Sequence, residues 1–138
     1  MVNKDVLNVR LAKLNAYLSD LYEVRQKTKE EFLGDKIIRG YVERTLQLAI
    51  EICLDIAHHI ISDNGWEEPE SNRETFTILA RHHVIHSDDI DELAKMAGFR
   101  NILVHNYIEI DPEKVYECLQ YGLEDIAGFG KSIKEKYF

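Results

Sequence analysis

The chain has 138 residues, of which 45% are apolar and 30% are charged, an ordinary balance for a globular protein of one domain. Its net charge of −8, from 25 acidic and 17 basic side chains, argues against a protein that coats nucleic acid by neutralising phosphates. An enzyme that contacts RNA through a small local patch is compatible with this charge. Two prolines and seven glycines favour a few long elements over many short strands.

The sequence shows no targeting or membrane segment. The first residues have no apolar run of signal-peptide length, and no segment approaches the roughly 18 apolar residues of a membrane span. We therefore expect a cytoplasmic protein with no membrane partner. Cys53 and Cys118 lie within apolar helical patterns and form no metal-type pair, which favours buried free thiols in a reducing compartment.

Five helical segments account for most of the chain. The first is predicted at about 4–29 from a seam of leucines at spacings of four and three. The seam consists of Leu7, Leu11, Leu14, Leu18 and Leu21. Gly34 then breaks the chain, and Asp35 is the expected N-cap of a second helix at about 36–62.

The second helix has an apolar stripe and a polar one. At 1.5 Å per residue it should be about 40 Å long. Its core stripe is Ile38, Val42, Leu46, Ala49, Cys53, Ile56 and Ile60. The opposite face carries Arg44, Gln47, Glu51, Asp55 and His58. We interpret Glu51, Asp55 and His58 as a solvated face or as partners for a basic residue, since only fragments of the Glu-x-x-His pattern of two-metal bundles are present.

A short third helix is expected at about 73–83 with Asn72 as its cap, and a fourth from a cap at Ser87 to about 105. Between them lies the segment RHHVIH, in which His82 and His86 are four residues apart. Two histidines make a weak metal site, no HExxH is present, and the third helix should end before His86. We expect no metal ion.

The fifth helix is predicted at about 112–135, because Asp111 followed by Pro112 is a strong start signal. No repeat, low-complexity tract or linker marks a second domain. The expected fold is all-α: residues 1–138 form a single domain, an antiparallel helical bundle of four long helices plus a short extra helix.

An arginine interrupts the apolar stripe of the fourth helix. That stripe is Ile90, Leu93, Ala97, Val104 and Tyr107. Arg100 falls on the same face, about 20° from Tyr107. Because burying an unpaired arginine costs several kcal/mol, either a carboxylate such as Glu51 or Asp55 meets it, or this face is a site.

Arg100 and His105 lie about 140° apart on an ideal helix, so they do not share a face. They can meet if the helix ends near His105 and the imidazole turns back, or if a second protomer supplies one of them. Phe99 and Ile102 make the other side of the helix apolar as well. A helix that is apolar all round favours burial against a second copy of the chain.

The segment RNILVHNY fits the motif Arg100-x4-His105-Asn106-Tyr107. It resembles the HEPN superfamily and, within it, the HepT-like toxins that are paired with minimal nucleotidyltransferase antitoxins. RGYVERTLQLAIEICLDIAHHI on the second helix and LAKMAGFRNILVHNYIEID around the motif are also similar to this family. The resemblance covers most of the chain, and the motif lies late in a fourth helix of an all-α sequence.

The resemblance implies a metal-independent endoribonuclease that acts as a homodimer, with the motif residues of both subunits lining one cleft. Arg100 and His105 would be catalytic. Tyr107 would receive AMP from the partner nucleotidyltransferase antitoxin, which silences the ribonuclease. Asn101 occupies the polar position that often follows the arginine. The family implies no cofactor, and RNA rather than DNA as the substrate.

The chemistry suits these residue types independently of the family. RNA carries its own nucleophile, the 2′-hydroxyl, so histidine can move protons while arginine stabilises charge on the phosphorane. Glu51 and Asp55 are candidates for supporting roles beside Arg100. The expected products are a 2′,3′-cyclic phosphate and a 5′-hydroxyl. The alternative is a non-catalytic nucleotide-binding or docking subunit for a nucleotidyltransferase.

Overall fold

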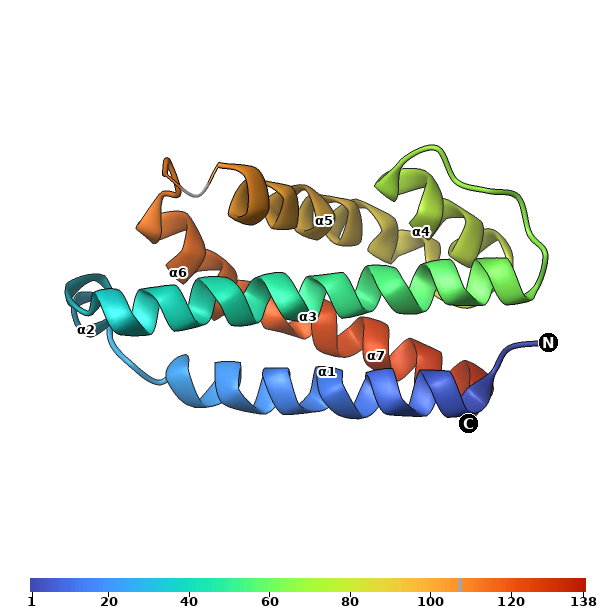
Figure 1. The fold of residues 1–138 in the computed structure, drawn as a ribbon, viewed down its shortest axis with the longest axis horizontal. Helices are drawn as coiled ribbons and strands as arrows, with labels where there is room; N and C mark the ends of the chain where they lie inside the picture. The colour runs from blue at the N-terminus through green and yellow to red at the C-terminus, as the bar shows by residue number, and fades with distance from the viewer. Residues whose placement is uncertain (107) are drawn as a thin grey trace.

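The computed structural model describes residues 1–106 and 108–138, and all regular elements within them are helical. The elements are α1 (Lys4–Val24), α2 (Lys29–Gly34), α3 (Lys36–Asp63), α4 (Asn72–Arg81), the 3₁₀ turn η1 (Ser87–Asp89), α5 (Ile90–His105), α6 (Pro112–Tyr121) and α7 (Leu123–Tyr137). Figure 1 shows the four long helices α1, α3, α5 and α7 running along the bundle, with both chain termini at one end. The all-α prediction is confirmed, although three short helices and a turn accompany the long ones.

The central element is α3, which packs against each of the other six α-helices. Asp35 caps it as predicted, its carboxylate accepting from the backbone N–H groups of Ile37 and Ile38. Among the described residues α3 is also the one helix long and apolar enough to cross a membrane. Its apolar character has a simpler cause, because helices surround it and bury eleven of its side chains.

The leucine seam of α1 is buried as predicted, but the helix ends at Val24 and not near residue 29. A separate helix, α2, follows. Thr28 and Glu31 form a reciprocal capping box at its start, which satisfies two backbone donors that a continuous helix would have paired internally. Phe32 is fully buried. With a single buried residue, this short helix has no periodicity by which the sequence could reveal it.

The predicted fifth helix is two helices, divided at Gly122. Asp111 caps α6 and Pro112 occupies its first turn, as expected. The Gly122 N–H donates to the Cys118 carbonyl, and a Cβ at position 122 would lie 2.8 Å from that oxygen. Such a contact is too close for any residue with a side chain, so the approach of these two backbones requires glycine.

Two cap assignments were wrong by one position or more. Ser71, and not Asn72, caps α4, accepting from the Glu74 N–H. Ser87 begins the turn η1, so α5 starts only at Ile90. As predicted, α4 ends before His86 and α5 ends at His105. Helix ends of this kind are the least certain part of a sequence-based assignment because neighbouring Ser, Asn and Asp can all serve as caps.

Candidate active site

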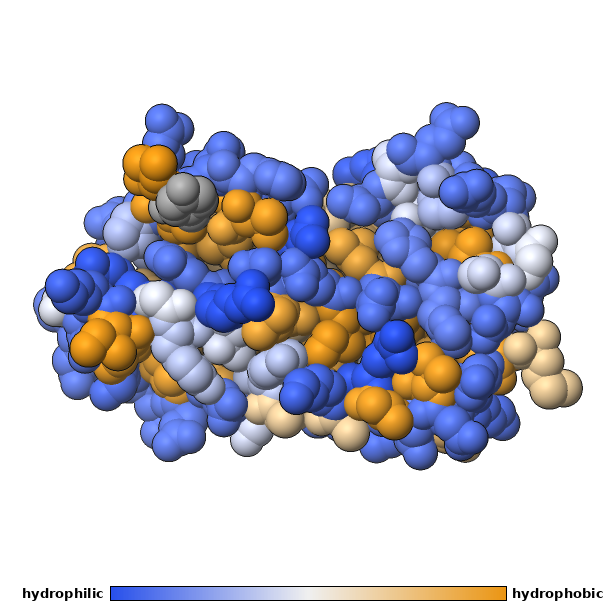
Figure 2. Space-filling view, viewed as in Figure 1, coloured by the Kyte–Doolittle hydropathy of each residue, from blue (hydrophilic) through white to orange (hydrophobic). Residues whose placement is uncertain are grey.

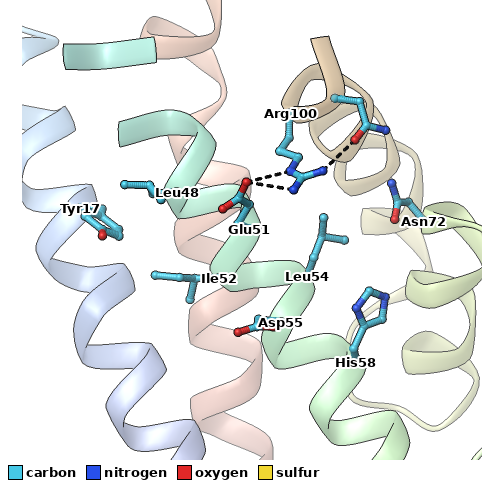
Figure 3. Close-up of a pocket in the computed structure, with 10 residues that line it drawn as sticks. Tyr17, Leu48, Glu51, Ile52, Leu54, Asp55, His58, Asn72 and Arg100 are labelled. Atoms are coloured by element: carbon cyan, nitrogen blue, oxygen red, sulfur yellow. Dashed lines mark hydrogen bonds and ion pairs between the residues drawn. The ribbon is translucent and has the colours of Figure 1, made fainter. Parts of the chain in front are cut away.

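Arg100 points from α5 toward α3, where it meets Glu51 (Figure 3). Glu51 Oε1 accepts from Arg100 Nε at 3.2 Å and from Nη2 at 2.9 Å. Arg100 Nη1 donates to the side-chain oxygen of its neighbour Asn101 at 3.1 Å. Of the two carboxylates expected near Arg100, Glu51 is therefore the partner, and Asn101 supports the guanidinium from the other side.

The pair is held in place but is open to solvent. Gln47, one turn earlier on α3, also donates to Glu51 Oε1, at 3.0 Å. The side chains of Arg100 and Glu51 are 28% and 32% exposed. Both N–H groups of the guanidinium donate to the same carboxylate oxygen. The pair therefore lacks the bidentate geometry, with one N–H group on each oxygen, that makes an arginine–carboxylate pair strongest. Nη1 and Nη2 each carry a second N–H group beyond the contacts with Asn101 and Glu51, and these donors can bind an incoming phosphate.

Asp55 lies one turn beyond Glu51 and pairs with a different arginine. Its carboxylate accepts from Arg10 Nε of α1 at 3.1 Å. The interpretation of the acidic stripe on α3 as partners for basic residues is thus confirmed for both carboxylates. Each negative charge is matched by an arginine, which lowers the repulsion that an RNA phosphate would meet here.

These residues line a groove of about 510 Å³. Its walls come from four helices, with Tyr17 from α1, Asn72 from α4, Arg100 and Asn101 from α5, and the polar stripe of α3 between them. Figure 2 shows this face hollowed between α4 and α5, with apolar surface inside the hollow. The sequence did not predict three of the lining residues, Tyr17, Asn72 and His58, as site residues. The sequence does not specify which elements lie next to theirs in the folded chain.

His105 lies at the end of α5, is exposed, and does not line the groove. The helix runs unbroken to this residue, and the Asn106 N–H continues the pattern by donating to the Ile102 carbonyl. Within one chain His105 is therefore not among the residues that form the groove around Arg100. Tyr107, the expected target of AMP transfer, lies outside the described residues.

The apolar surface of α5 differs from the expected stripe. The buried residues are Leu93, Met96, Ala97 and Leu103. Val104 is only half-buried, because the face that packs between α3 and α4 is turned toward Met96 and Leu103. On the other side Phe99 is half-buried and Ile102 is 41% exposed. In a single chain this second side remains partly open.

The remaining titratable candidates have structural roles. The His82 ring stacks on Trp66, and His86 Nδ1 accepts from the Asp88 N–H. No group of three or more possible metal ligands converges in the part of the chain that the structure describes.

Burial raises the pKa of the Cys53 thiol far above its usual value, and burial likewise raises the pKa of Cys118 to about 12. Both thiols are therefore protonated and unreactive near neutral pH.

The contact with Glu51 should contribute modestly to stability. We expect Glu51→Ala to lower the free energy of unfolding by about 1 kcal/mol, because it leaves a partly buried guanidinium without its acceptor. Glu51→Gln keeps an amide oxygen and should lose less. Urea denaturation measures both changes, and an alanine variant as stable as the parent chain would show that the pair does not stabilise the fold.

Comparisons with known proteins agree with this geometry. A family model described as ribonuclease HepT-like matches residues 14–133. The chain is 38% identical over 104 residues to the mRNA nuclease HepT of Shewanella oneidensis, a match that covers 75% of this chain and 78% of that protein. It is 28% identical over 128 residues to the tRNA nuclease HepT of Aphanizomenon flos-aquae, covering 93% and 87% of the two chains.

A solved structure with the same fold is that of the tri-AMPylated HEPN toxin of Shewanella oneidensis in complex with its MNT antitoxin. It superposes with a TM-score of 0.85 at 33% identity, covering 95% of this chain and 98% of that chain. The HEPN-like bundle expected from the sequence is therefore confirmed.

Proposed function

The chain belongs to the ribonuclease HepT-like family and is an RNA-cleaving enzyme, and we propose that it is the toxin of a toxin–antitoxin pair that cuts RNA without a metal ion. The observation that carries the proposal is the guanidinium of Arg100, held by Glu51 at the edge of an open groove. Such a group has donors fixed in a plane, which suits the non-bridging oxygens of a phosphodiester.

The proposed reaction uses the ribose of the substrate as nucleophile. The 2′-hydroxyl loses its proton to a base and its oxygen attacks the adjacent phosphorus, while the bond to the 5′-oxygen breaks and that oxygen takes up a proton. Arg100 stabilises the negative charge on the phosphorane, and His105 transfers a proton. The products are a 2′,3′-cyclic phosphate and a 5′-hydroxyl.

We propose that the complete site is formed by two copies of the chain. Within one chain His105 does not line the groove of Arg100, whereas Ile102 and Phe99 leave an apolar side of α5 partly open. A closed two-fold dimer that covers this side would bring both motifs close to one axis.

The dimer is directly measurable. We expect static light scattering at tens of micromolar to give twice the chain mass of 16.1 kDa. Replacing Ile102 by a charged residue should shift the equilibrium toward the monomer, since it places a charge in an apolar contact. A chain that is monomeric at this concentration would contradict the shared site.

The proposed partner is a minimal nucleotidyltransferase antitoxin in the cytoplasm. The support is the similarity to a HEPN toxin whose solved structure is AMPylated and bound to an MNT antitoxin. Tyr107, at the end of the motif that begins at Arg100, is the proposed acceptor of AMP in this chain.

Product analysis tests the activity. Purified protein should cut single-stranded RNA in excess EDTA and leave cyclic phosphate ends, which resist phosphatase until acid opens them to monophosphates. A strict requirement for added divalent metal would overturn the proposed mechanism. RNA that stays intact under all conditions, together with tight binding of a nucleotidyltransferase, would support the non-catalytic docking subunit instead.

A further inference from the structure

A second hollow adjoins the groove of Arg100. It has a volume of about 660 Å³ and lies between the C-terminal half of α3 and the segment that leads to α4. Its lining residues are His58, Ile61, Ser62, Trp66, Glu68 and Pro69. His58 lines both hollows, so a ligand that extends from Arg100 along α3 passes this residue and reaches Trp66.

The indole of Trp66 is fixed in orientation. Its ring stacks on the His82 imidazole with centroids 3.7 Å apart and planes 4° from parallel. The Trp66 backbone N–H donates to the Ile61 carbonyl at 3.1 Å, which ties the segment to the end of α3. An aromatic ring that is already ordered loses little entropy when a flat ligand packs on it, and stacking of a nucleobase on such a ring contributes about 1–3 kcal/mol.

The hydrogen bonds around His58 favour one tautomer of its ring. The Thr75 hydroxyl donates to the Ser71 carbonyl at 3.0 Å, and His58 Nε2 lies 3.3 Å from the same hydroxyl oxygen. The shorter contact is the better place for the single hydroxyl hydrogen, and this arrangement makes Nε2 the donor to Thr75. In a neutral imidazole the other nitrogen is then an acceptor. Thr75 is buried and anchors the exposed His58 ring, so Nδ1 presents its lone pair to a ligand.

The second hollow favours a base over a phosphate. His58 Nδ1, the Ser62 hydroxyl and the Glu68 carboxylate can all accept hydrogen bonds, and no Lys or Arg is among the described residues that line it. A phosphate would meet a carboxylate without a compensating cation. A base edge with N–H donors fits this wall, and guanine offers two adjacent ones, N1–H and the N2 amino group, whereas uracil offers one.

The spacing of Glu51 and His58 on α3 indicates that this base belongs to a nucleotide next to the one whose phosphate binds Arg100. Glu51 and His58 are seven residues apart on α3, which is about 10.5 Å along the helix axis and nearly the same face. Because Arg100 is paired with Glu51, a strand that binds to Arg100 and runs along α3 meets His58 about two turns further on. A strand that places its phosphate on Arg100 can place a neighbouring base at His58 and Trp66.

We propose that this second hollow is a nucleobase subsite of the RNA strand, with guanine packed against Trp66 and donating to His58 Nδ1 and the Glu68 carboxylate. The subsite rests on the proposed ribonuclease function, since it selects the sequence beside the cut. His58 acts here as a specificity-determining residue and takes no part in proton transfer at the phosphorus.

The chain contains a single tryptophan, so its fluorescence reports on Trp66 alone. The probes are two 2′-O-methyl tetranucleotides, which cannot be cut through the 2′-oxygen: one has a guanosine among uridines and the other has uridines only. We expect saturable quenching of Trp66 emission by the first, and binding at least fivefold weaker for the second. Unchanged emission with both probes up to millimolar concentration overturns the subsite, and equal affinity for the two overturns the choice of guanine.

Matched variants test the role of His58. His58→Gln keeps a donor for Thr75 and removes the Nδ1 acceptor, so it should fold normally and bind the guanosine probe about tenfold more weakly, which is about 1.4 kcal/mol. His86→Gln changes an exposed histidine that lines neither hollow and should bind like the parent chain. Equal weakening in both variants would overturn the assignment of His58.

Cleavage assays keep the two proposals separate. Natural RNA that is cut by the parent chain while Trp66 emission is unchanged overturns the subsite and leaves the ribonuclease proposal intact. RNA that is never cut overturns the proposed function, and the response of Trp66 to the uncleavable probes still decides whether a base binds in this hollow.

Discussion

Replacing Arg100 by alanine is expected to lower kcat/KM for RNA cleavage at least about 100-fold, a loss of about 2.7 kcal/mol of transition-state stabilisation. The guanidinium is the cationic group placed at the groove by α5, and no other arginine or lysine lines that groove among the described residues. Without it, the charge that develops on the phosphorane has no fixed donor. His105→Ala should cause a loss of similar size because it removes the proposed proton-transfer group.

Arg100→Lys provides the control for this experiment. It keeps the positive charge but loses the planar set of donors, so its activity should lie between those of the parent chain and the alanine variant. Circular dichroism must show that each variant is folded, since Arg100 also holds Glu51. Full activity of either alanine variant would contradict the assignment of the motif residues.

Mixing the two inactive variants tests whether the site is shared. If Arg100 of one protomer acts with His105 of the other, half of the randomly formed dimers contain one complete site of two, and about a quarter of the activity returns. If both residues act within one chain, mixing restores nothing. The first outcome is expected because His105 does not line the groove of Arg100 within one chain.

The sequence predicted best those elements whose residues repeat over many turns. The leucine seam of α1 is buried as expected, and so is the apolar stripe of α3 apart from the half-buried Ile38, because a period near 3.6 sustained over about four turns or more has no other common cause. The starts of α3 and α6 also followed from local chemistry, as Asp35 and Asp111 carry their cap hydrogen bonds within three residues.

The elements that depend on tertiary contacts could not be predicted. The break at Gly122 is an exception with a local cause, since the contact is with Cys118 one turn earlier, and the apolar pattern continues across it as in one long helix. Periodicity placed Arg100 on a packed face of its helix. It left three interpretations open: an ion pair with Glu51, an ion pair with Asp55, or a functional site. Only the docking of α5 on α3 selects Glu51.

Transfer of AMP to Tyr107 is expected to silence RNA cleavage as fully as Arg100→Ala does. The modification adds a nucleoside and a negatively charged phosphodiester two residues after His105. That phosphate can bind the guanidinium of Arg100 and so compete directly with RNA, while the bulk of the nucleoside excludes the strand. No conformational switch is needed, because charge and volume act at the same place.

The unmodified hydroxyl should matter little for catalysis, since tyrosine is a poor general base near neutral pH. Tyr107→Phe is therefore expected to keep most of the ribonuclease activity and to escape neutralisation by a cognate nucleotidyltransferase and ATP. Mass spectrometry after incubation with the partner measures the transfer, with the Phe variant as the matched control. If the parent chain gains no AMP on Tyr107, or if the Phe variant is silenced equally well, the hydroxyl is not the regulatory site and only packs near the end of α5.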